Sequence, residues 1–224
     1  MEEKQKIINE HRKFFSSTKR VYEIFKRDIE ILRRQDKYSQ AIQISLTFIF
    51  IDFFSRIYLI FQGYRDDNLE KNNEQRFRGW CDSFILNENN ELYKKHKGKI
   101  SPNSKFLWIM RNSFLHFFSF PSRDKTGGPI VFSFNIEESQ DEEILKELRK
   151  KHKHVNHINL YYLIDAVLDS YLCFHVFLIK EVDRDIVSYR KNLSYANLLL
   201  TKELASTIIV SKKDKKENSK NITP

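Results

Sequence analysis

The stretch AIQISLTFIFIDFFSRIYLIF, residues 41–61, is the most apolar in the chain and decides the class of fold. The uncharged run at residues 38–51 is shorter than the roughly 20 apolar residues that a membrane-spanning helix needs. Asp52 and Arg56 then follow at i and i+4, where two side chains share one helix face and can pair. We therefore interpret the stretch as a buried central helix with an internal ion pair, and keep a membrane segment as the alternative.

A second stretch of the same kind, LYYLIDAVLDSYLCFHVFLI at residues 160–179, lies within a long predicted helix over about residues 158–189. It is apolar on nearly every side, which is typical of a helix in the centre of a fold. Asp165, Asp169 and His175 interrupt it, so it is unsuited to the interior of a membrane. We expect these three polar groups to be satisfied inside the core or at an interface.

The composition favours an all-α fold. The chain of 224 residues has 5 Gly and 4 Pro, which excludes collagen-like and linker-like chains and a turn-dense all-β fold. Hydrophobic residues make up 41% and aromatic residues 14%, so the chain has enough apolar surface to fold and is not disordered as a whole. A chain of this length buries roughly 70% of its surface and needs no disulfides to do so.

The rest of the chain is predicted to alternate between helices and polar loops. The first helix carries an apolar stripe at spacings of three, four and seven residues. Another helix begins where Ser101 can cap the free amides and Pro102 suits the first turn. Residues 117–120 and 131–134 also fit a small β-hairpin. The predicted helices are 2–35, 76–86, 102–119, 139–153 and 195–210, and the polar loops are 63–75 and 87–98.

We expect one helical domain over residues 1–210, made of a basic amphipathic N-terminal helix (1–37) and a core (38–190). Residues 211–224, SKKDKKENSKNITP, have a single apolar residue, Ile222. Such a segment has almost no apolar surface to bury, so it is predicted to be a disordered basic tail.

The net charge of +9 is unevenly distributed. Residues 1–37 carry 11 Lys or Arg against 7 acids, and residues 211–224 carry 5 Lys against 2 acids. Basic patches favour polyanions such as nucleic acid or acidic lipid, although a run of charge is also common on an ordinary solvated face. A third basic cluster, without an acid inside it, consists of Arg149, Lys150, Lys151 and Lys153.

The two cysteines, Cys81 and Cys173, lie in apolar surroundings and are too few for a disulfide framework or a four-ligand zinc site. The chain begins with Glu2, Glu3 and Lys4 and has no apolar signal region there. We therefore expect a reducing compartment, the cytoplasm.

One predicted helix carries a candidate for chemistry, R-N-S-F-L-H, from Arg111 to His116. The spacing alone is weak evidence, because the chain repeats it in R-K-K-H-K-H, from Arg149 to His154, within a solvated run of charge where we expect no site. On a helical wheel, Asn112 and His116 point to one side, opposite the face expected to be buried, and Arg111 lies between the two faces. That buried face consists of Phe106, Leu107, Met110, Phe114, Phe117 and Phe118.

Apolar residues flank this polar pair: Trp108, Ile109 and Leu115. Polar groups set among apolar ones, away from the core of their own chain, indicate a second surface that something covers. The simplest cover is a second copy of the chain, since most soluble oligomers are symmetric. We therefore expect a homodimer.

The order of these features resembles the HEPN superfamily (higher eukaryotes and prokaryotes nucleotide-binding domains), helical proteins that include ribonucleases of toxin, CRISPR and antiviral systems. The resemblance rests on the helix with Arg111, Asn112 and His116, and the Asn directly after the Arg is its more specific part. Asp52 matches the acid often found in an earlier apolar helix. The resemblance covers the order of helices from about residue 38 to 180. It implies a HEPN-like helical bundle that cleaves RNA without a metal ion, at a site made by two copies of the motif.

The residue types suit that chemistry. RNA supplies its own nucleophile, the 2′-OH, so the protein needs only proton transfer and charge stabilisation. His116 is expected to exchange the protons, and Arg111 to hold the scissile phosphate. Asn112 is expected to orient His116 or a phosphate oxygen. Because one protomer supplies one histidine, two copies provide a base and an acid, and the products are a 2′,3′-cyclic phosphate and a 5′-OH.

The expected function is therefore that of an endoribonuclease, a toxin or antiviral effector, with RNA and a neutralising antitoxin or regulatory protein as partners. The basic cluster at Arg149 is expected to follow the RNA backbone. His152, His154 and His157 are poor metal ligands because neighbouring Lys and Arg repel a cation, so no metal or other cofactor is expected. The alternatives are a non-catalytic binding module for nucleic acid or a partner protein, and a purely structural helical protein.

Overall fold

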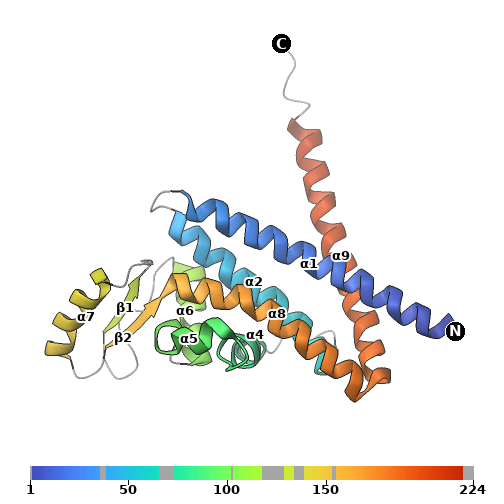
Figure 1. Ribbon diagram of the computed structural model, residues 1–224. Coiled ribbons are helices and arrows are strands. Elements are labelled where there is room, and N and C mark those ends of the chain that lie inside the picture. The colour runs from blue at the N-terminus through green and yellow to red at the C-terminus, as the bar shows by residue number, and fades with distance from the viewer. Residues whose placement is uncertain are drawn as a thin grey trace, which may run out of the picture.

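A computed structural model describes residues 2–35, 39–65, 73–101, 103–117, 129–133, 139–152 and 155–218. As predicted, the fold is built from helices, with one small β element (Figure 1). The helices are α1 (Glu2–Arg33), α2 (Gln40–Phe61), α4 (Asn73–Trp80), α5 (Glu91–Ile100), α6 (Ser104–Phe117), α7 (Ser139–Lys151), α8 (Leu160–Arg184) and α9 (Ile186–Asn218). A short π-helix, η2 (Cys81–Ile85), follows α4, and the strands are β1 (Ile130–Ser133) and β2 (Asn156–Asn159).

The two apolar stretches form the helices α2 and α8. Both are long and apolar enough to cross a membrane by length and composition. However, 61% of the most apolar window of α2 and 50% of that of α8 are buried inside the fold. This burial favours the interpretation of both as central helices of a helical core. Their completely buried side chains include Phe48, Ile51, Phe54, Leu163, Val167 and Phe174.

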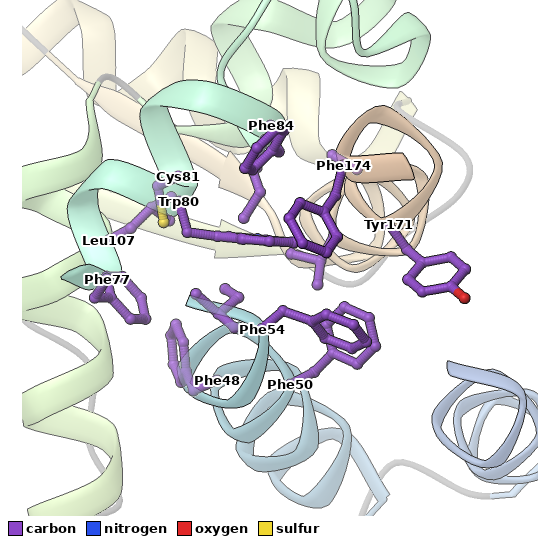
Figure 2. Packing of buried hydrophobic residues seen from close by; sticks show 14 of the residues in the cluster. Phe48, Phe50, Phe54, Phe77, Trp80, Cys81, Phe84, Leu107, Tyr171 and Phe174 are labelled. Atoms are coloured by element: carbon purple, nitrogen blue, oxygen red, sulfur yellow. The ribbon is translucent and has the colours of Figure 1, made fainter. Parts of the chain in front are cut away.

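The core between these helices is aromatic (Figure 2). The ring centroid of Phe54 lies 5.6 Å from that of Trp80, 5.4 Å from Tyr171 and 6.4 Å from Phe174. Aromatic rings attract one another at these separations in tilted and edge-to-face arrangements. Because Trp80 ends α4 and is completely buried, it holds α4 against α2, and this contact positions the candidate site.

The basic N-terminal helix α1 belongs to the same core. Its residues Phe14, Phe25 and Ile29 are buried in the common hydrophobic cluster. α1 crosses α9 (Figure 1), where Asn197 Nδ2 donates to the carbonyl oxygen of Glu10 at 2.9 Å. The exposed face of α1 carries basic side chains, among them Arg12, Lys13, Lys19 and Arg20.

The described residues form a small parallel sheet, which the sequence did not predict. β1 pairs with β2 in parallel, from Ile130 opposite Asn156 to Ser133 opposite Asn159. Of the predicted partner strand, residues 117–120, the structure describes only Phe117, at the end of α6, and the rest lies outside the described residues. Parallel strands need a long crossover connection, which here contains α7. The second strand was missed because its four residues, N-H-I-N, run directly into an apolar helix.

Several helix boundaries also differ from those predicted. α6 is capped by Asn103, whose Oδ1 accepts the amide of Phe106 at 2.9 Å, and not by Ser101. α9 begins earlier than predicted, because Asp185 Oδ1 accepts the amides of Val187 and Ser188 and so starts a new helix directly after α8.

The predicted disordered tail begins inside a helix. α9 continues to Asn218, and residues 219–224 lie outside the described part of the chain. Residues 211–218 contain no Gly or Pro, and Lys and Glu readily propagate a helix that has already been nucleated.

α5 occupies a segment that was predicted to be a polar loop, and Asn90 explains why. Asn90 is completely buried, and its Oδ1 accepts the amide of Tyr93 in the first turn of α5 at 2.9 Å. Its Nδ2 donates to the carbonyl oxygens of Phe84 at 2.9 Å and Ala166 at 2.8 Å. One side chain therefore caps α5 and ties it to η2 and α8.

Replacing Asn90 with alanine is expected to lower the free energy of unfolding by about 2–4 kcal/mol, because it leaves a buried amide and two carbonyl oxygens without their partner. Urea unfolding followed by circular dichroism measures the loss. The control is Asn89→Ala, since Asn89 is exposed, and a change below about 0.5 kcal/mol is expected there. Equal losses in both variants would contradict this role of Asn90.

Candidate active site

Asp52 of α2 and Arg111 of α6 meet between the two helices. Nε of Arg111 donates to Asp52 Oδ2 at 3.0 Å, and Nη2 donates to the same oxygen at 2.6 Å. The Arg111 and Asp52 side chains are 20% and 19% exposed, so both are partly accessible to solvent. The sequence predicts that Asp52 pairs with Arg56 within α2. The ion pairs that the structure gives for the Asp52 carboxylate are with arginines of two other helices.

Further contacts of Arg111 lie within α6. Its Nη1 donates to Asn112 Oδ1 at 2.9 Å, and its Cζ lies 5.2 Å from the ring centroid of Trp108. The guanidinium group is therefore oriented by a carboxylate, an amide and an aromatic face. Asn112 was predicted to orient His116 or a phosphate oxygen, and its oxygen is turned to Arg111. His116 lies one turn further along α6, and its side chain is outside the described part of the structure.

α6 presents these groups because its opposite face is anchored in the core. Of the residues predicted to be buried, Phe106, Leu107, Met110 and Phe114 are buried as expected. The side chain of Phe117 and the residue Phe118 lie outside the described part of the chain.

Arg76 of α4 is a further member of this site that was not predicted. It is 3% exposed, and its Nη2 lies 4.0 Å from Asp52 Oδ1. Helical spacing provides the signal that could have found it. Residues 76, 77 and 80 share one face of α4, and the burial of Phe77 and Trp80 carries Arg76 into the interior. We call Asp52, Arg76, Arg111 and Asn112 the Asp52 cluster.

The Asp52 cluster has one carboxylate and two guanidinium groups, so its formal charge is +1. The two carboxylate oxygens differ. Oδ2 accepts both hydrogen bonds from Arg111, whereas Oδ1 is buried and accepts no hydrogen bond from any described residue. A site with this charge and a partly exposed guanidinium group is suited to an anion such as a phosphodiester.

The predicted RNA-binding cluster lies on α7. Arg149, Lys150 and Lys151 are exposed in its last turn, and Lys150 pairs with Glu147 at 2.5 Å. Lys153 lies outside the described residues, as does His154, the end of the second Arg-x4-His spacing. α7 lies with the small sheet at one end of the molecule (Figure 1).

The histidines after α7 are not brought together in the described residues. His152 is exposed, whereas His157 of β2 shares a hydrogen bond with Ser133 of β1, with 2.9 Å between Nε2 and Oγ. Within the ranges that the structure describes, no group of three or more His, Cys, Asp or Glu side chains could hold a metal ion.

The polar groups of α8 connect it to other helices. Asp165 accepts a hydrogen bond from Arg33 of α1 at 2.5 Å. Asp169 accepts the amide of Glu91 at 3.1 Å, and burial raises the pKa of this carboxyl. The ring of His175 packs against that of Phe15, 4.2 Å away between centroids. Burial and, to a smaller extent, the charge of His11 lower the pKa of His175 to about 4.

A separate cleft of about 570 Å³ opens between the end of α2, η2 and α8. Aromatic rings and a few polar groups line it, and the apolar side chains Leu172 and Val176 at its edge are 54% and 53% exposed. Burial raises the pKa of Cys173 in its wall to about 11, so this thiol stays protonated at neutral pH. Such a cleft suits an apolar side chain of a partner or a small molecule.

Comparison with protein-family models, with curated proteins and with solved structures finds no match. The Asp52 cluster and the motif around it are therefore the features of the chain that point to a function.

Proposed function

We propose that the protein is a metal-independent endoribonuclease of the HEPN type that acts as a homodimer. The observation that carries the proposal is the contact between Asp52 and Arg111, with Asn112 beside it. An acid of an early apolar helix thus lies against the Arg-Asn pair of a later helix. If the Arg-x4-His spacing had arisen by chance, there would be no reason for Asp52 to lie in contact with Arg111.

In the proposed reaction, His116 of one protomer takes the proton of the 2′-OH, and the oxygen attacks the adjacent phosphorus. Arg111 stabilises the negative charge that builds on the pentacoordinate phosphate. His116 of the other protomer gives a proton to the leaving 5′-oxygen. The reaction breaks the P–O5′ bond and leaves a 2′,3′-cyclic phosphate and a 5′-OH.

The proposal needs two copies because one chain supplies one His116. The helix α6 is suited to face its own copy across a two-fold axis, since Arg111 and Asn112 are partly exposed on it beside Trp108. The exposed basic side chains of α1 and α7 suit an RNA backbone. We propose a role as a cytoplasmic toxin or antiviral effector, restrained by an antitoxin or regulatory protein.

The test is incubation of the purified protein with end-labelled RNA in EDTA. We expect cleavage to persist in EDTA, with cyclic phosphate ends in mass spectrometry. DNA of the same sequence is expected to stay intact because it has no 2′-OH. Light scattering under the same conditions is expected to give the mass of a dimer.

Two results would refute the proposal. One is cleavage that requires an added divalent cation or that also cuts the DNA. The other is an active protein that is monomeric at the assay concentration, because a monomer has no second His116.

Partner binding without catalysis is the second candidate function. The cleft between η2 and α8, with the exposed Leu172 and Val176 at its edge, favours it. RNA that stays intact in every buffer, together with capture of a partner that Leu172→Asp and Val176→Asp abolish, would favour this function over the ribonuclease.

A further inference from the structure

The Asp52 carboxylate is shared unequally between two arginines. Its Oδ2 accepts two hydrogen bonds from Arg111, and its Oδ1 lies 4.0 Å from Arg76 Nη2, too far for a hydrogen bond. The side chain of Arg76 is 4% exposed, so water screens this interaction little. A charged side chain on an eight-residue helix is thus kept inside the protein beside the candidate site.

In the free protein, Arg111 is already engaged. Its Nε and Nη2 bond Asp52 and its Nη1 bonds Asn112. A substrate phosphate is a second anion that competes with Asp52 for the same guanidinium group. When Arg111 turns its charge toward the phosphate, the partly buried carboxylate of Asp52 is left with a weaker partner. A buried charge without a close partner raises the free energy of the folded protein.

We propose that Arg76 is a positioning residue that takes over the Asp52 carboxylate when Arg111 engages the phosphate. This inference rests on the proposed ribonuclease function. A movement of about 1 Å brings Arg76 Nη2 and Asp52 Oδ1 within hydrogen-bond distance. Asp52 then remains paired and charged throughout the reaction, and Arg111 is free to follow the charge on the phosphate. Arg76 itself touches no reacting atom.

α4 offers a matched control, Arg78. It lies on the same helix and pairs with Glu74 at 3.1 Å, but its side chain is 39% exposed. A loss of positive charge at Arg78 therefore changes the net charge of the protein equally and leaves the Asp52 cluster intact.

The experiment is a double-mutant cycle of Arg76→Met and Asp52→Asn, with kcat and KM measured on the same RNA. We expect Arg76→Met to lower kcat by at least about tenfold with a smaller change in KM, and Arg76→Lys to lower kcat by only about threefold. In the Asp52→Asn background, Arg76→Met is expected to change kcat by less than about twofold, because no carboxylate is left to hold. Arg78→Met is expected to stay within about twofold of the wild type.

An equal loss in both backgrounds would overturn the proposal, since Arg76 would then act independently of Asp52. If Arg76→Met fails to fold, as circular dichroism will reveal, the cycle is run with Arg76→Lys. That variant keeps the charge and loses the planar fork, so a fall of about threefold is expected in the Asp52 background only.

A second measurement separates this inference from the proposed function. If the wild type leaves RNA intact, the ribonuclease proposal fails, and the cycle is measured as binding of a fluorescent 2′-O-methyl RNA by anisotropy. Non-additivity of at least about threefold in Kd supports the exchange of Asp52 between the two arginines. Additive effects overturn it.

Discussion

Replacing His116 with alanine is expected to slow RNA cleavage by about 10²–10⁴-fold, the range that a positioned proton-transfer group contributes. Replacing Arg111 with alanine is expected to cost about 10²–10³-fold, because a donor to the developing phosphate charge is lost. Arg111→Lys does not restore the rate, because lysine has no planar fork of donors for the phosphate oxygens. Initial rates at saturating labelled RNA measure these losses, and circular dichroism and light scattering confirm that fold and dimer are retained.

The second Arg-x4-His spacing provides the control for this prediction. His154→Ala removes the histidine of R-K-K-H-K-H, which follows the exposed last turn of α7, and a change of less than about twofold is expected. Full activity in His116→Ala, or an equal loss in His154→Ala, would show that residues 111–116 are not the catalytic motif.

Replacing Trp80 with alanine is expected to lower the free energy of unfolding by about 3–5 kcal/mol, the usual cost of removing a large aromatic side chain from a core. Trp80 is completely buried, and its ring centroid lies 5.6 Å from Phe54, 4.6 Å from Phe84 and 5.1 Å from Phe174 (Figure 2). Because domains are stable by only about 5–15 kcal/mol, a large share of the stability is expected to be lost. Urea unfolding followed by circular dichroism measures it.

Trp80→Phe is the comparison variant for Trp80→Ala. Trp80 Nε1 is buried and has no acceptor among the described residues, so phenylalanine removes a buried donor together with part of the ring. A loss of about 1 kcal/mol or less is expected. Losses of equal size in Trp80→Phe and Trp80→Ala would show that the packing of α4 does not depend on a ring at this position.

Much of the helical fold follows from local patterns. Continuous apolar sequence at residues 41–61 and 160–179 predicts the two core helices, and the described side chains on the inward face of α6, from Phe106 to Phe114, are buried where the helical wheel puts them. The helix α5 was not predicted, because its segment, E-L-Y-K-K-H-K-G-K-I, is polar and has no apolar stripe. Asn90 stabilises its first turn, and Asn90 is itself held by the carbonyl of Ala166, 76 positions further along the chain.

The candidate site, like the fold, could be predicted from the sequence only in part. Arg111 and Asn112 are neighbours in the chain, so the motif is visible in the sequence. The resemblance to HEPN proteins indicated Asp52, but neither spacing nor composition predicts that its carboxylate accepts hydrogen bonds from Arg111, 59 positions away. The helical spacing of Arg76 with Phe77 and Trp80 could have indicated its burial, but it gives no partner, and a single arginine on a short polar helix is usually a surface residue.

The amino-acid sequence alone determined the helical class of this protein and the adjacency of Arg111 and Asn112, since both depend on residues within a few positions of one another. Only the tertiary structure decided that β1 pairs in parallel with β2, that α4 carries Arg76 into the interior, and that Asp52 lies between two arginines. The physical reason is the sequence separation of the interacting residues. Helix formation and capping depend on contacts within a few residues, whereas an ion pair across the core forms only after packing of aromatic side chains such as Trp80 has brought distant helices together.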